Sequence, residues 1–247
     1  MNAQLTDLEQ LDILAKACRI LARHGHNDFT LGHLSWRTED GRGFWMKRNA
    51  IGLSEVRDSD DFVLMNFDGR KVRGSGQNHS EWPIHSEIYQ ARADVAAVSH
   101  THPFYGCVMS GLDEAPDPYT LAADYFTAVP RFHDDAALIQ TKQQGRALAQ
   151  SLGPHFVVSM ANHGVTCCGR SIEQMVCNAI FYEQACKAHL TGRASGRTAS
   201  PIEPAVRKIR HGQVMTDSHI EQTWKFLLRE EADGRDTPMR QNIGGYD

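Results

Sequence analysis

The sequence predicts a three-layer α/β/α domain with a central, largely antiparallel sheet. Short runs of β-forming residues interleave along the chain with longer stretches in which apolar residues recur at helical spacing. In the first half, Asp-Gly turn signals separate the runs, and the spacing fits hairpins better than parallel βαβ units. No repeat or linker is visible, so we expect one domain over residues 1–247, with a looser C-terminal tail from about residue 193.

The first half begins with a predicted helix. Thr6 and Glu9 form a capping box, apolar residues follow at helical spacing, and Gly25 is a natural end. Three β-like runs come next, at residues 34–36, 44–46 and 62–64. A glycine-rich loop over residues 74–78 then leads into a second helix with Pro83 in its first turn.

The second half continues the alternation. We expect a buried strand over residues 95–99, and a hairpin whose strands are residues 156–160 and 165–168. Helices are expected at residues 136–152, from a Ser171–Gln174 cap to about residue 190, and after a second cap at Ser218 and Glu221. Residues 193–211 have few apolar side chains and are expected to form an exposed connection.

Composition and charge exclude several classes of protein. Apolar residues make up 41% and charged residues 23%, which argues against disorder. A net charge of −4 provides no basic surface for nucleic acid, and no stretch approaches the roughly 18 apolar residues of a membrane helix. The N-terminus lacks the basic segment of a secretory signal, and the six cysteines show no disulfide framework spacing. We therefore expect a cytoplasmic protein with no nucleic-acid or membrane partner.

Thirteen histidines stand out, and two of them lie close together. His100-Thr101-His102 follows an apolar run, and residues i and i+2 of a strand point to one face, so both imidazoles can meet at one point. Neutral imidazole is a common ligand of divalent transition metals. The alternative is that two histidines merely flank a threonine.

His163 supplies a third candidate ligand, in the turn Asn162-His163-Gly164. The glycine can adopt positive φ and let the histidine stand at a sheet edge, although the tripeptide also fits ordinary turn chemistry. Three histidines leave an open coordination position, as a catalytic metal site requires. We predict one divalent metal ion, and zinc, manganese, iron and cobalt all suit the three ligands.

Glu81 is the candidate catalytic residue. It lies between the glycine-rich loop and a helix start, where a carboxylate beside a metal can act as general acid or base. The alternative is a first-turn glutamate that the helix dipole favours. His85 lies four residues further on, hence on the same helix face, and we interpret it as a supporting or core histidine.

Taken together, these residues resemble the class II aldolase/adducin family. Ser80-Glu81, His85, residues 89–95, His100-Thr101-His102 and Asn162-His163-Gly164 carry the resemblance, which extends over about residues 8–190. It implies an α/β/α fold, a metal held by His100, His102 and His163, and a catalytic Glu81. It also implies a homo-oligomer, commonly a tetramer, with active sites at subunit contacts.

The chain departs from the aldolases of this family where those grip a substrate phosphate. They have a Gly-Asn pair, a Thr-Gly or Ser-Gly loop and a Ser-Ser pair, whereas this chain has Gly32-His33, Lys47-Arg48-Asn49-Ala50 and His79-Ser80. Arg matches a carboxylate with two parallel hydrogen bonds, and Lys offers a point charge. The predicted substrate-binding residues are His33, Lys47, Arg48, Asn49, His79 and Ser80. The alternative for the basic pair is solvated surface charge.

This pattern resembles the branch of metal-dependent decarboxylases of hydroxylated aromatic or pyridine dicarboxylates. We therefore expect a lyase of aromatic catabolism that decarboxylates a hydroxylated aromatic or heteroaromatic (di)carboxylate. An aldolase or epimerase acting on a sugar acid or sugar phosphate is the alternative, because one metal site serves either reaction. A non-catalytic interaction domain, as in adducin, is disfavoured because the three histidines and Glu81 are all present.

Overall fold

The computed structural model describes residues 6–133, 138–197, 200 and 202–234. Their strands form one eight-stranded sheet in the order β4-β3-β2-β1-β5-β8-β7-β6, and every pairing is antiparallel except β6 with β7. The strands are β1 (His33–Arg37), β2 (Gly43–Lys47), β3 (Phe62–Asn66), β4 (Lys71–Arg73), β5 (Ala97–Thr101), β6 (Arg131–Phe132), β7 (Val157–Met160) and β8 (Gly164–Gly169). The predicted, largely antiparallel sheet is confirmed.

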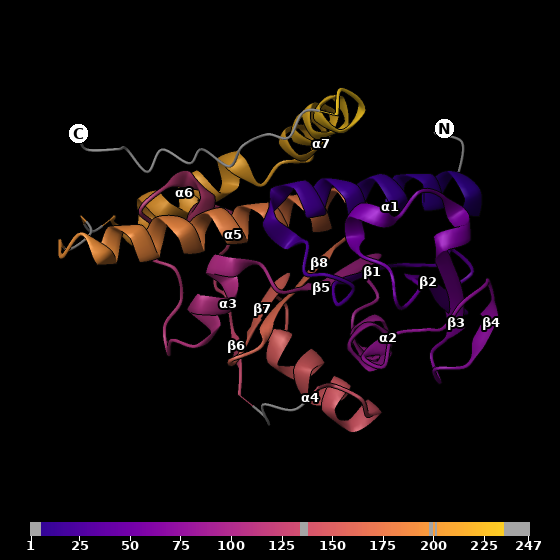
Figure 1. Ribbon diagram of the computed structural model, residues 1–247. Helices are drawn as coiled ribbons and strands as arrows, with labels where there is room; N and C mark the ends of the chain where they lie inside the picture. Colours follow the sequence, from indigo (N-terminus) through magenta and orange to yellow (C-terminus); the bar gives the residue numbers. More distant parts are fainter. Residues whose placement is uncertain (1–5, 134–137, 198–199, 201, 235–247) are drawn as a thin grey trace.

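Helices cover both faces of this sheet (Figure 1). They are α1 (Asp7–Leu21), α2 (Trp82–Ala91), α3 (Phe104–Ser110), α4 (Lys142–Leu152), α5 (Ile172–Ala194), α6 (Pro204–Val214) and α7 (Asp217–Ala232). Figure 1 shows α1, α5 and α7 on one side, and α2 with α4 on the other. The three-layer α/β/α architecture predicted from the sequence is therefore confirmed.

Side-chain alternation along the strands builds a separate core on each side of the sheet. On β2, Trp45 packs into the core beneath α1 and α5, whereas Phe44 and Met46 pack into the core above α2 and α4. The adjacent Cys167 and Cys168 of β8 divide in the same way, and both are fully buried. Because each central strand is buried on both faces, the polar side chains among them must bond to one another or face a site.

Local capping chemistry fixes most helix starts as predicted. Thr6 and Glu9 form the expected capping box of α1, and Ser171 accepts from the backbone N–H of Gln174 at the start of α5. Helix α7 starts differently, because Thr216 rather than Ser218 is the N-cap and accepts from the N–H of His219.

Two helical segments differ from the expectation. Helix α4 begins at Lys142 behind its own Thr141 cap rather than at residue 136, and residues 134–137 lie outside the described part. The stretch 193–211, predicted from the sequence to be an exposed connection, contains most of α6. Pro204 occupies the first turn of α6 and none of its described residues is buried, so no apolar periodicity marked this helix.

The centre of the sheet positions the candidate site. Strand β5 lies between β1 and β8, and the register pairs His33 with His100, and His100 with Thr166. The turn between β7 and β8 stands beside the end of β5. None of the described helices is long and apolar enough to cross a membrane.

Candidate metal centre

Three histidines from two neighbouring parts of the sheet converge. His100 lies within β5, His102 follows its end, and His163 stands in the β7–β8 turn. The Nε2 atoms of His100 and His102 are 3.1 Å apart, and one ring nitrogen from each of the three lies within 4.8 Å of the others. The predicted convergence is present, while the role of the three side chains as ligands stays a prediction.

The backbone of the β7–β8 turn explains how His163 reaches this point. The positive φ that we expected of Gly164 belongs instead to Asn162, at 53°. Gly164 is required for a different reason: a Cβ atom there would lie 2.6 Å from His102 Cδ2 and 2.6 Å from the carbonyl oxygen of Thr101. The glycine thus lets the turn approach the His102 ring closely.

In both His100 and His102 the Nδ1 atom, which faces away from the other histidines, makes a hydrogen bond. These two bonds fix which ring nitrogen carries the proton. His102 Nδ1 lies 3.0 Å from Asp28 Oδ2, and a carboxylate can only accept, so His102 holds its proton on Nδ1. His100 Nδ1 lies 3.3 Å from Thr166 Oγ1. The Thr166 hydroxyl donates to Met160 Sδ, so its oxygen accepts from His100 Nδ1–H.

This tautomer assignment makes the centre suitable for a cation. His100 and His102 both turn Nε2 lone pairs toward each other across 3.1 Å, an arrangement that repels until a positive charge lies between them. His163 Nε2 is buried without a hydrogen-bond partner among the described residues. The three nitrogens therefore suit a divalent metal ion, with the carboxylate of Asp28 orienting one ligand from behind.

The protonation state of the three rings also fits metal binding, which requires neutral imidazole. Burial lowers the pKa of His163 to about 4, with a further contribution from His102. Burial likewise lowers the pKa of His102, although Asp28 opposes this, and holds the pKa of His100 well below its usual range. All three rings are thus neutral at physiological pH.

Glu81 occupies the N-cap position of α2, where the chain turns from the 74–80 loop into the helix. Its Oε1 accepts the backbone N–H of Ile139 at 2.9 Å, and its Oε2 lies 3.7 Å from His100 Nε2 and 3.9 Å from His33 Nε2. Burial raises the pKa of Glu81, while the Ile139 N–H opposes this. A carboxyl group so placed can hold or release a proton beside the three histidines.

Two further predicted residues, His33 and His79, border the same point. His33 is fully buried, and its ring centroid lies 4.5 Å from that of His79. The Nε2 atoms of both rings lack a hydrogen-bond partner among the described residues. Nitrogen and oxygen atoms of His33, Glu81 and His100 also lie within 4.8 Å of one another, so they form a second group with ligand-like spacing.

The remaining predicted substrate-binding residues already have other partners or lie at the surface. Lys47 is fully buried, and its Nζ donates to the carbonyl oxygens of Thr30 and Ile51. Arg48 pairs with Asp61 at 3.0 Å. Asn49 Oδ1 accepts the N–H of the next residue, and Ser80 is exposed. Contact of these four with a substrate stays a prediction that requires some of them to change partners.

Sequence reasoning missed the residues that support the site from behind. Asp28, Thr166 and Ile139 are distant in sequence from the groups that they bond, and no local pattern marks them. For Asp28 the signal available was weak: a carboxylate that follows two histidines in His24-Gly25-His26-Asn27-Asp28.

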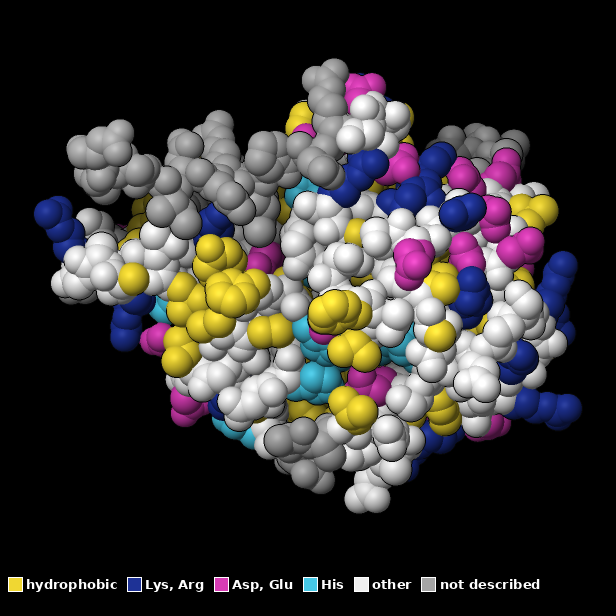
Figure 2. All heavy atoms as spheres, viewed as in Figure 1, with side chains coloured by type: hydrophobic (Ala, Val, Ile, Leu, Met, Phe, Trp, Pro, Cys, Tyr) yellow, Lys and Arg dark blue, Asp and Glu magenta, His cyan; other side chains and the backbone are white. Residues whose placement is uncertain are grey.

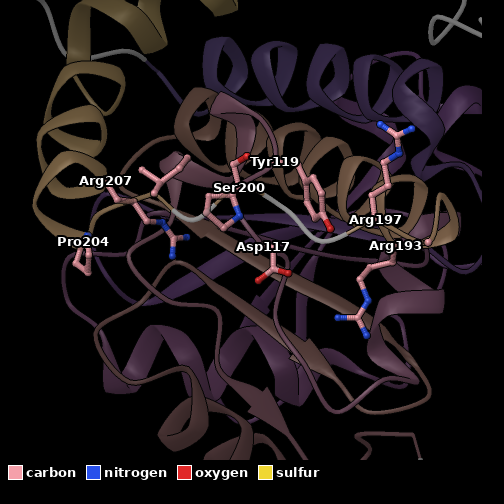
Figure 3. Close-up of a pocket in the computed structure, with 10 residues that line it drawn as sticks. Asp117, Tyr119, Arg193, Arg197, Ser200, Pro204 and Arg207 are labelled. Carbon is pink, nitrogen blue, oxygen red and sulfur yellow. The ribbon is translucent and has the colours of Figure 1, made fainter.

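The space-filling view shows histidine side chains gathered in a hollow, with hydrophobic side chains around them (Figure 2). A different pocket, of about 660 Å³, is lined by Asp117, Tyr119, Arg193, Arg197 and Arg207 and by none of the site residues. Figure 3 shows that its arginines do not converge, because Arg193 and Arg197 point in opposite directions. We therefore place the candidate chemistry at the histidine cluster.

Comparisons with known proteins agree with the motif resemblance. The family model described as class II aldolase and adducin N-terminal domain matches residues 12–190. The chain is 29% identical over 214 residues to a 3,4-dihydroxyphthalate decarboxylase from Rhodococcus jostii (strain RHA1), which covers 81% of this chain and 87% of that protein. It is 28% identical over 175 residues to a 5-methylthioribulose-1-phosphate/5-deoxyribulose-1-phosphate aldolase from Rhodospirillum rubrum. This match covers 69% of this chain and 76% of that protein.

The fold has close counterparts among solved structures. An aldolase II superfamily protein from Pseudomonas syringae superposes with a TM-score of 0.85 at 23% identity, covering 95% of this chain and 96% of that one. At this identity the likeness concerns the fold alone. Decarboxylases and aldolases both occur among the similar proteins.

Proposed function

The chain belongs to the class II aldolase and adducin family, and from that premise we propose that it is a metal-dependent lyase that decarboxylates a hydroxylated aromatic or heteroaromatic (di)carboxylate. The observation that carries the proposal is the set of lone pairs that His100 and His102 turn toward each other, with a buried carboxyl group, Glu81, 3.7 Å away. His100, His102 and His163 would hold the divalent ion. Zinc, manganese, iron and cobalt all suit three imidazole ligands.

When bound at these histidines, a divalent cation would act as a Lewis acid and stabilise negative charge on a substrate oxygen. The chain supports this chemistry by keeping the three imidazoles neutral and by fixing the tautomers of His100 and His102 through Thr166 and Asp28. Two of the three proposed ligands are thus oriented before an ion binds.

His33 and His79 favour a carboxylate substrate over a phosphate. Their rings are adjacent, and the Nε2 atom of each is unpaired within the described residues. Flat rings with an unpaired nitrogen each suit a planar aromatic carboxylate, whereas a phosphate is commonly held by backbone N–H groups and small hydroxyl side chains. The similar 3,4-dihydroxyphthalate decarboxylase, whose name states an aromatic dicarboxylate, supports this assignment.

Glu81 is proposed as the proton donor. In the reaction the bond between the ring carbon and the carboxylate breaks, CO2 leaves, and the electron pair stays on the ring carbon. That carbon then takes a proton, and the Glu81 carboxyl group is able to supply it because burial raises its pKa. A proton from solvent restores Glu81 afterwards, so that one proton is consumed for each CO2 released.

The test compares two substrate classes on one protein. The purified chain, loaded separately with zinc and manganese, is incubated with dihydroxyphthalates and with ketose 1-phosphates. We expect CO2 release from the former and no aldehyde from the latter. Aldehyde release from ketose phosphates without any decarboxylation would overturn the proposal in favour of the aldolase or epimerase alternative, which the similar Rhodospirillum rubrum aldolase supports.

We also propose that the chain acts as one domain and as a homotetramer in the cytoplasm. Three strongly exposed apolar side chains flank residues of the site: Phe29 (85% exposed) follows Asp28, Phe104 (69%) follows His102 closely, and Leu138 (50%) precedes Ile139. Exposed apolar side chains gathered around a site often mark a subunit contact. Light scattering should give the mass of a tetramer, and Phe104→Ser should lower it; a monomeric wild-type chain would overturn this part.

A further inference from the structure

A series of buried hydrogen bonds connects Tyr89 of α2 to His33 at the candidate site, all on the face of the sheet that α2 covers. Tyr89 Oη lies 2.7 Å from Ser35 Oγ, and Ser35 Oγ lies 2.6 Å from His85 Nδ1. His85 Nε2 in turn lies 2.7 Å from His33 Nδ1. At most 2% of each of the four residues is exposed, so all three hydrogen bonds are shielded from solvent.

The direction of these hydrogen bonds is decided at the Tyr89 end. A phenol carries one hydrogen. Within the described residues the Tyr89 hydroxyl has two partners, Ser35 Oγ at 2.7 Å and the backbone N–H of Val98, and because an N–H can only donate, Ser35 Oγ is the acceptor for the phenol hydrogen. If the chain ran the other way, Ser35 would donate to Tyr89 and leave the phenol hydrogen buried without an acceptor, which is strongly unfavourable. Tyr89 therefore donates to Ser35.

The remaining directions follow one by one. Ser35 accepts from Tyr89, so its own hydrogen goes to His85 Nδ1. His85 then carries its proton on Nε2 and donates it to His33 Nδ1. A ring nitrogen that accepts a hydrogen bond carries no hydrogen, and every imidazole keeps at least one N–H. The one proton of His33 must sit on Nε2.

We propose that Tyr89, Ser35 and His85 are positioning residues that fix His33 as an Nε2–H donor aimed at a substrate oxygen. This inference rests on the proposed function only for the identity of that oxygen, a carboxylate of the substrate. His33 Nε2 is buried, has no hydrogen-bond partner among the described residues, and lies 3.9 Å from Glu81 Oε2. The His33 Nε2–H group is thus an available hydrogen-bond donor beside Glu81, the proposed proton donor.

His33 and His100 differ in which ring nitrogen carries the proton, although both lie close to Glu81. By distance, His33 groups with Glu81 and His100 as a potential metal ligand. A ligand, however, must offer a lone pair, as His100 does because Thr166 accepts its Nδ1–H. His33 offers a hydrogen instead. The centre therefore has three histidine ligands, with His33 on the substrate side.

Tautomers are measured directly by two-bond ¹H–¹⁵N spectra of the full chain with ¹⁵N-labelled histidine, recorded with and without zinc. The ring resonances of His33 and His85 are assigned as those that disappear in His33→Gln and His85→Gln, respectively. We expect His33 and His85 as Nε2–H tautomers in both states, and His100 and His102 as Nδ1–H tautomers. An Nδ1–H tautomer at His33, or a shift of its Nε2 resonance on addition of zinc, would overturn the proposal.

Tyr89→Phe removes the hydroxyl group that sets the direction of the hydrogen bonds between Tyr89 and His33. His33 and His85 should become mixtures of both tautomers, and kcat/KM for a hydroxylated phthalate should fall roughly tenfold at unchanged zinc content. Ser35→Ala, a second small change, should give the same result. Tyr182→Phe, at a buried tyrosine of the opposite core, is the matched control and should change neither readout.

The tautomer spectra and the activity assay distinguish failure of the proposed function from failure of the positioning role. If the tautomers are as expected but no hydroxylated aromatic carboxylate is decarboxylated, the proposed function is wrong and the positioning chain stands. If Tyr89→Phe and Ser35→Ala both leave His33 entirely as the Nε2–H tautomer, the positioning role is wrong, whatever the substrate.

Discussion

Asp28 Oδ2 accepts a hydrogen bond from His102 Nδ1 at 3.0 Å, across 74 residues of sequence. The carboxylate fixes the His102 tautomer, so that Nε2 faces His100 Nε2 at 3.1 Å. The same contact ties the 27–32 segment, which precedes β1, to the end of β5. One hydrogen bond thus couples the shape of a loop to the geometry of the proposed metal centre.

Asp28→Asn should weaken metal binding about 10–100-fold, as is typical when the partner of a metal-bound histidine loses its charge. Competition with a chelator measures the affinity. The amide keeps the size of the side chain, so the free energy of unfolding without metal should change little. Asp12→Asn, at an exposed aspartate paired with Lys16, is the control. Equal affinities of the two variants would show that Asp28 does not support the ligand.

Glu81→Gln should abolish most of the activity while leaving the metal bound. The amide can still accept the Ile139 N–H but cannot deliver a proton, so kcat should fall roughly 10²–10⁴-fold. Metal content after dialysis and kcat are measured on the same preparation, with the exposed Glu221→Gln as control. Loss of the metal together with activity would instead make Glu81 a ligand.

The sequence was informative wherever chemistry and periodicity are local. The His-Thr-His spacing, the Thr6–Glu9 capping box and the hairpin carrying His163 all depend on residues a few positions apart, and the structure has each of them. The family motifs also predicted the architecture correctly. Local sequence patterns, together with the family motifs, thus predicted the layers of the fold and the three converging histidines.

Long-range pairing could not be predicted in the same way. Nothing local connects Tyr89 with Ser35, or Asp28 with His102, because these contacts depend on strand register and loop path. Lys47 is the clearest case: next to Arg48 it suggested a surface cation for an anionic substrate, yet it is fully buried and bonded to backbone carbonyl groups.

Acid should destabilise the fold partly through His26, which is fully buried and bonded to Thr101 Oγ1 at 2.8 Å. Burial lowers the pKa of His26 to about 3, against about 6.5 in the unfolded chain. The unfolded state therefore binds more protons below pH 6.5, and stability is lost as the pH falls from about 6.5 toward 3. This one residue should contribute about 2 kcal/mol of loss between pH 7 and pH 5.

Chemical denaturation at pH 7, 6 and 5 gives the free energy of unfolding, and the slope of that free energy against pH measures the effect. His26→Gln should be less stable at pH 7 but show a flatter dependence on pH. His133→Gln, at an exposed ring, should keep the wild-type slope. If both variants keep that slope, His26 is not the source of the acid sensitivity.

Gly164→Ala should disturb the proposed metal centre through packing alone. The added Cβ would lie 2.6 Å from His102 Cδ2 and from the carbonyl oxygen of Thr101, so the β7–β8 turn or the His102 ring must move. Overpacking of this kind typically costs about 1–3 kcal/mol, and the displaced ring should lower metal affinity as well. Gly212→Ala, in open space on α6, is the matched control and should be neutral or stabilising by up to about 1 kcal/mol. Wild-type stability and metal affinity in Gly164→Ala would mean that the close approach of turn and ring is not needed.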